Sequence, residues 1–82
     1  MHGSIINAGS KIGDHNILNS KSLIEHDVEI GNFCHLATGT IINGHCKIND
    51  DTFIGSGSVL KQGIIIKKKS LIAMSSIIKH SN

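Results

Sequence analysis

Isoleucine or leucine returns at every sixth position along the chain. The positions are Ile6, Ile12, Leu18, Ile24, Ile30, Leu36, Ile42, Ile48, Ile54, Leu60, Ile66, Ile72 and Ile78. A second column, four residues after each of these, holds mostly small or β-branched side chains: Ser10, Asn16, Ser22, Val28, Cys34, Thr40, Cys46, Thr52, Ser58, Ile64, Ser70 and Ser76. A repeat this strict reflects the architecture of the whole chain and takes precedence over local propensities.

The repeat predicts an all-β protein. Side chains alternate along a strand, so the fifth residue of each hexad and the first residue of the next point inward, and the sixth points outward. Each hexad is therefore a short strand followed by a corner. The corners hold residues that tolerate unusual backbone angles: Asn7, Gly13, Asn19, Gly31, Asn43, Asn49 and Gly55. Equal short strands joined by corners wind into a parallel β-helix.

The outward-facing positions indicate three hexads, about 18 residues, per coil and about four coils in all. With that coil length, residues one coil apart share an outer face. One face is mostly charged and consists of Lys11, Glu29, Lys47 and Ile65. A second is apolar except for one histidine and consists of Ile17, His35, Phe53 and Leu71. A third is wholly apolar and consists of Ile5, Leu23, Ile41, Val59 and Ile77. Two exposed apolar faces need cover. Three prisms around a threefold axis would provide it, so we expect a homotrimer.

Composition narrows the possible classes. The 82 residues predict one domain, from residue 3 to residue 82, and the net charge of +2 with two phenylalanines argues against a nucleic-acid partner. No apolar run has the length of a signal peptide or a membrane span, so we expect a cytoplasmic protein without a membrane partner. Cys34 and Cys46 both fall in the small inward column, which favours core packing over a disulfide or a metal pair.

Four segments carry a more specific pattern: Ile17-Leu18-Asn19, Ile24-Glu25-His26-Asp27, Ile30-Gly31-Asn32-Phe33-Cys34-His35-Leu36 and Phe53-Ile54-Gly55-Ser56-Gly57-Ser58. With the hexads, they resemble the hexapeptide-repeat acyltransferases, and among these the bacterial sugar O-acyltransferases of the sialic acid O-acetyltransferase (NeuD-type) group and the related UDP-4-amino-sugar N-acetyltransferases. The resemblance implies a left-handed parallel β-helix, a trimer, acetyl-CoA as donor, and a sugar or nucleotide sugar as acceptor in bacterial glycan or sialic acid biosynthesis.

The resemblance also implies roles for individual residues. Those assigned to catalysis are His26 as general base, Asp27 as its support and the backbone amide of Gly44 as oxyanion donor. Those assigned to binding are Asn19 on the acceptor side, His35 near the acetyl donor or the acceptor, and the backbone at Ser56 and Met74 against coenzyme A.

The spacing of three of these residues suits acetyl transfer. The reaction needs a base near the attacking amine or hydroxyl and a donor for the oxygen that becomes negative. His26 and Gly44 are one coil apart, so a ring and a backbone N–H share one corner column, and Asp27 follows directly and could orient the imidazole. His35 lies in the middle of another face. If both histidines serve one reaction centre, that centre lies between subunits.

Other interpretations stay open. Members of the family usually add an N-terminal nucleotide-sugar-binding subdomain and a C-terminal GNPA-like motif, which these residues lack, and Lys67, Ala73 and Met74 replace expected glycines. The chain is then an excised core, a truncated product or a stand-alone variant. The alternative function is a non-catalytic β-helix trimer that does not bind the donor. The acceptor atom, nitrogen or oxygen, is also open.

A zinc enzyme of the γ-class carbonic anhydrase type would share the fold. That family needs two ligands five residues apart, and no pair among the histidines has this spacing: His2, His15, His26, His35, His45 and His80. We therefore expect no metal site. His15 and His45 are expected to be solvated corner residues without a role.

Overall fold

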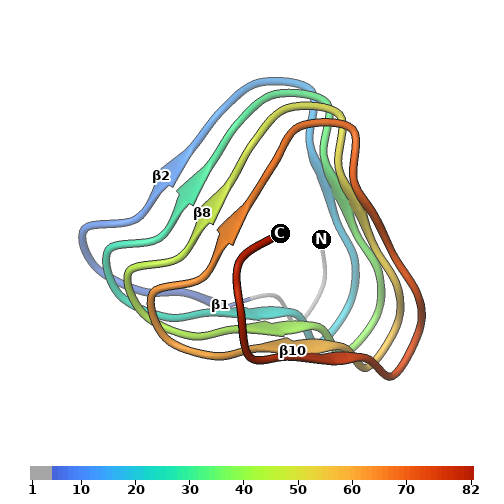
Figure 1. The fold of residues 1–82 in the computed structure, drawn as a ribbon. Coiled ribbons are helices and arrows are strands. Elements are labelled where there is room, and N and C mark those ends of the chain that lie inside the picture. The colour runs from blue at the N-terminus through green and yellow to red at the C-terminus, as the bar shows by residue number, and fades with distance from the viewer. Residues whose placement is uncertain (1–4) are drawn as a thin grey trace.

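Residues 5–82 are described by a computed structural model, and short strands joined by corners make up all of its regular structure (Figure 1). Residues 3 and 4, where the predicted domain begins, lie outside the described residues. Each strand ends on one of the sixth-position isoleucines or leucines: β1 (Ile5–Ile6), β2 (Lys11–Ile12), β3 (Ile17–Leu18), β4 (Leu23–Ile24), β5 (Glu29–Ile30), β6 (His35–Leu36), β7 (Ile41–Ile42), β8 (Lys47–Ile48), β9 (Phe53–Ile54), β10 (Val59–Leu60), β11 (Ile65–Ile66), β12 (Leu71–Ile72) and β13 (Ile77–Ile78).

The strands form three parallel sheets, one on each side of a triangular solenoid (Figure 1). Sheet A has the order β1-β4-β7-β10-β13, sheet B the order β11-β8-β5-β2, and sheet C the order β12-β9-β6-β3. Leu23 pairs with Ile5 on one side and with Ile41 on the other, so each coil adds three strands. The predicted all-β parallel solenoid of about four turns is confirmed. Over residues 5–82 we find no helix with the length and apolar character to cross a membrane.

The two inward columns form the core. Ile24, Leu36 and Ile42 are completely buried, whereas Ile6 at the first coil is 43% exposed because no coil covers it from outside. In the small column, hydroxyl and thiol groups donate to corner carbonyls of the next coil, as Cys46 does to Lys61 at 2.9 Å and Ser58 to Ala73 at 3.0 Å. These bonds satisfy polar groups that burial would otherwise leave without partners.

Cys34 and Cys46 are confirmed as core residues. Both are about 1% exposed, and neither forms a disulfide. Burial raises the pKa of both thiols, because a thiolate would lose its hydration in the core.

The prediction of where the corners take unusual backbone angles was wrong. The left-handed backbone falls on the third corner residue, for example Asp27 with a φ of 57° and His45 with a φ of 59°, and not on the asparagines and glycines that open the corners. Those opening residues serve other needs. The Asn43 side chain donates to the Leu60 carbonyl at 2.9 Å, and a Cβ at Gly55 would lie 2.5 Å from the Met74 nitrogen of the next coil.

The outer faces separate as predicted. Sheet B carries exposed charged residues outward, including Lys11, Glu29 and Lys47. Sheets A and C expose apolar side chains, with exposed fractions of 63% for Ile77 and 77% for Leu71.

Candidate functional site

The corner between sheets A and B carries the strongest candidate chemistry. Four equivalent third-corner residues line up along it, all with positive φ: Gly9, Asp27, His45 and Gly63. Asp27 and His45 are neighbours in this column, and glycines flank the pair, so no side chain above or below covers it. The backbone ties the two coils together through the His45 N–H, which donates to the His26 carbonyl at 3.2 Å.

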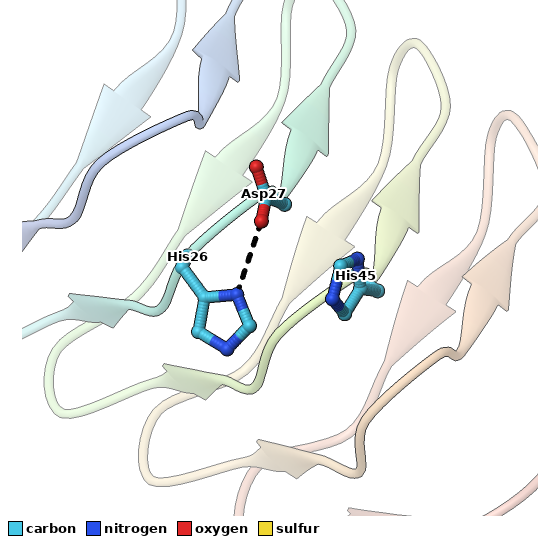
Figure 2. Close-up of side chains that lie close together, drawn as sticks. All are labelled: His26, Asp27 and His45. Carbon is cyan, nitrogen blue, oxygen red and sulfur yellow. Dashed lines mark hydrogen bonds and ion pairs between the residues drawn. The ribbon is translucent and has the colours of Figure 1, made fainter.

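His26 and Asp27 are paired at this corner (Figure 2). Nδ1 of His26 lies 3.1 Å from Oδ2 of Asp27, and the two side chains are 56% and 53% exposed. An ionised carboxylate only accepts hydrogen bonds, so the pairing places the proton of the neutral imidazole on Nδ1. The lone pair of the ring is then on Nε2. This is the orientation that the sequence predicted for Asp27 as a support of His26.

Gly44, one coil after His26, lies in contact with the His26 imidazole. A Cβ at Gly44 would lie 2.9 Å from Nε2 and 3.0 Å from Cε1 of His26, closer than side-chain carbons approach one another. Nε2 therefore lies directly against the Gly44 backbone. Within residues 5–82 the Gly44 N–H has no backbone acceptor, whereas its carbonyl accepts the Gly63 N–H at 3.0 Å.

A shallow pocket of about 370 Å³ opens beside these groups. Its lining comes from three successive coils of the same corner: Glu25, His26, Asn43, Gly44, Lys61 and Gln62. His26 and Gly44 thus line a common space, which also has a cationic residue, Lys61, and an anionic residue, Glu25, in its walls.

A second group of predicted residues lies on sheet C. Nε2 of His35 in β6 is 2.9 Å from the Asn19 side-chain amide, and its ring packs edge-on against Phe53 with centroids 5.0 Å apart. His35 is half-buried on an otherwise apolar face. The Asn19 amide gives this polar ring the partner that such a position requires.

Ser56 and Met74 lie on adjacent coils at the corner between sheets C and A. The Ser56 carbonyl accepts the Ser75 N–H at 2.8 Å, and Met74 is 71% exposed. The predicted site residues therefore fall into two groups. One group is His26, Asp27 and Gly44, and the other is Asn19, His35, Ser56 and Met74. The solenoid places the two groups at different parts of the triangle, as the sequence predicted for His26 and His35.

His45 is the residue that sequence reasoning missed at this corner. It is exposed, as predicted, but its ring meets that of His26 edge-on with centroids 5.0 Å apart (Figure 2). The signal was present in the sequence, since His45 follows Asp27 by one coil. A linear spacing of five between ligands does not detect this pair, whereas the 18-residue period of the coil does.

A search with protein-family models and a search of curated proteins both give no match to this chain. The fold defines the class, a three-sided parallel β-solenoid. The resemblance to the acyltransferases stays a prediction from the sequence motifs.

Proposed function

We propose that this chain is an acetyl-CoA-dependent acetyltransferase acting on the amine or hydroxyl of a sugar or nucleotide sugar, with His26 as general base. The proposal extends to the setting that the motifs suggest, bacterial glycan or sialic acid biosynthesis in the cytoplasm. One observation carries it: Asp27 holds Nδ1 of His26, and Nε2 lies against the Gly44 backbone beside an open pocket.

In this reaction, His26, Asp27 and Gly44 have separate roles. The acetyl thioester supplies the activated acyl group. Nε2 of His26 takes the proton from the attacking amine or hydroxyl, and the Asp27 carboxylate stabilises the imidazolium that results. When the C–S bond of the tetrahedral intermediate breaks, His26 returns this proton to the sulfur, and coenzyme A leaves as the free thiol. The Gly44 N–H donates to the oxygen that becomes negative, and removing such a donor costs about 10²–10³-fold in turnover. Base and donor come from adjacent coils, so the backbone sets their spacing.

We further propose that the coil is left-handed and that three chains form a homotrimer. The trimer is supported by the apolar outer faces of sheets A and C, on which Ile5, Ile17 and Ile77 are 56%, 52% and 63% exposed. Packing sheet C of one subunit toward the A–B corner of another would bring Asn19 and His35 to the His26 of that neighbour. Ser56 and Met74 are the proposed backbone contacts for coenzyme A.

An assay of coenzyme A release from acetyl-CoA tests the function. Acceptors are a panel of amino sugars, sialic acid and nucleotide sugars, and donor binding is measured separately by calorimetry. Turnover with one acceptor is expected to be lost in His26→Ala and kept in His15→Asn, because asparagine tolerates the φ of 59° at His15. The His15 control removes another exposed corner histidine, which stacks on Phe33 and not on an acid. Absence of both turnover and donor binding would instead favour the non-catalytic β-helix.

A further inference from the structure

His26, Asp27 and His45 form a group of three metal-capable side chains that acetyl transfer uses only in part. Each offers a ring nitrogen or a carboxylate oxygen, and these atoms lie within 4.8 Å of one another. Figure 2 shows the His45 ring beside His26 and Asp27, on the coil that follows theirs. His45 has no place in the proposed reaction, so its proximity calls for a separate explanation.

We propose that these three residues bind a divalent transition-metal ion of the zinc class. Two imidazoles and one carboxylate are a donor set that zinc accepts, with one coordination position left for water. Ligand atoms around tetrahedral zinc are about 3.4 Å apart for bonds of about 2.1 Å. Nδ1 of His26 and Oδ2 of Asp27 are already 3.1 Å apart. The three donor atoms lie within 4.8 Å of one another, so the exposed His45 side chain has to approach by at most about 1.4 Å to reach tetrahedral spacing.

The backbone prearranges this donor set. Asp27 and His45 have φ values of 57° and 59°, a conformation that holds both side chains in one column at the outer edge of the corner. Gly9 and Gly63 occupy the same column on either side, so solvent and metal reach the group freely. Asp27 and His45 are stacked at the third corner position, and His26 directly precedes Asp27. Over residues 5–82, no second group of three potential metal ligands lies this close together.

Metal binding and general-base catalysis would both use the imidazole ring of His26, so the two functions compete. Coordination at Nδ1 of His26 requires the proton there to move to Nε2, so the ring stays neutral but Nε2 no longer has a free lone pair. Asp27 is also removed from its hydrogen bond with Nδ1. This consequence rests on the proposed acetyltransferase function: zinc should inhibit turnover by occupying the base, and the metal-free chain is the active form.

Titration of the untagged protein with ZnCl2 by calorimetry tests the site directly. We expect one ion per chain, and binding weakened by about 100-fold in His45→Asn, at least the loss seen when an outer partner of a metal site is removed. His15→Asn is the matched control, because His15 is also an exposed corner histidine with a φ of 59° and asparagine tolerates that conformation. Imidazole NMR signals of His26 and His45, and not of His15, should change on adding Zn²⁺. Equal affinity in His45→Asn and in the parent, or no binding at all, would overturn the site.

The competition is tested by the ratio of turnover with Zn²⁺ to turnover with EDTA. The ratio should fall well below one in the parent and in His15→Asn, and should rise toward one in His45→Asn. Zinc binding that depends on His45 but leaves this ratio at one would refute the competition and keep the site. Zinc binding without any turnover would refute the acetyltransferase and keep the site, so the two proposals fail separately.

Discussion

Replacing Gly44 by alanine should disable the base without unfolding the protein. Gly44 lacks a positive φ, so alanine can adopt its backbone conformation. The new Cβ, however, would lie 2.9 Å from Nε2 of His26. Ordinary carbon contacts begin at about 3.4 Å. The imidazole therefore has to move by about 0.5 Å or rotate away, and because its side chain is 56% exposed, it can turn into solvent.

The expected cost in stability is small and the expected cost in rate is large. Gly→Ala at a compatible position stabilises by about 0.4–1 kcal/mol through the unfolded chain. Moving an exposed ring offsets part of this, as does the approach of the new Cβ to 3.3 Å from the His26 backbone carbonyl, so the net change should stay within about 1 kcal/mol. When the ring turns into solvent, the reaction loses its general base, which costs about 10²–10⁴-fold in rate. We therefore expect turnover to fall at least about 10²-fold.

Gly63→Ala provides the opposite control. Nothing lies within 4 Å of a Cβ at Gly63, but its φ is +77°, which alanine disfavours by about 1–2 kcal/mol. This variant should lose stability in urea denaturation and keep its turnover per folded molecule. We would measure steady-state kinetics, urea denaturation and the NMR signal of His26 for both variants. Together these separate a displaced base from a loss of stability. Normal turnover in Gly44→Ala, or an unmoved His26 signal, would show that Gly44 does not hold the His26 ring in its active position.

Other outcomes follow from the same geometry. His26→Ala should change the free energy of unfolding by no more than about 0.5 kcal/mol and lower turnover by about 10²–10⁴-fold, with donor affinity nearly unchanged. Asp27→Asn should lower turnover by less. The reverse order of the two variants in steady-state kinetics would contradict their roles. Ile41→Asp, in the middle of sheet A, should convert the trimer to monomers in sedimentation velocity, and a monomeric parent would disprove the face assignment. A thiol reagent should label Cys34 and Cys46 slowly in the native protein and rapidly in guanidinium, because both are buried and burial raises the pKa of both thiols.

Most of the fold could be read from the sequence because one period governs it. Strand position, inward side chains and coil length all follow from the column that includes Ile24 and Ile42, since a parallel solenoid stacks equivalent residues directly above one another. The same arithmetic placed Gly44 beside His26. Handedness does not follow from it, because a column of buried residues is the same in either hand.

The period could not predict how side chains meet at the corners. It did not show that the left-handed conformation falls on Asp27 and His45. That prediction would require knowledge of how each corner is hydrogen-bonded to the next coil. It also did not show that Asn19 reaches His35, because Asn19 opens a corner and His35 lies in a strand of the next coil. Such contacts depend on rotamers and on the offset between corner and strand, which a count of residues leaves open.

The corners are suited to chemistry because the core does not depend on them. An inward side chain such as Ile42 is completely buried, and truncating a residue of this kind costs about 2–5 kcal/mol. His26, Asp27 and His45 are exposed, and their replacement removes few packing contacts. The backbone that positions them is nevertheless fixed on both sides by hydrogen bonds between coils. A corner of the solenoid can therefore exchange one set of functional groups for another at little cost in stability, provided that the residue placed at the third position tolerates a positive φ. The coil spacing keeps each new pair at a defined distance.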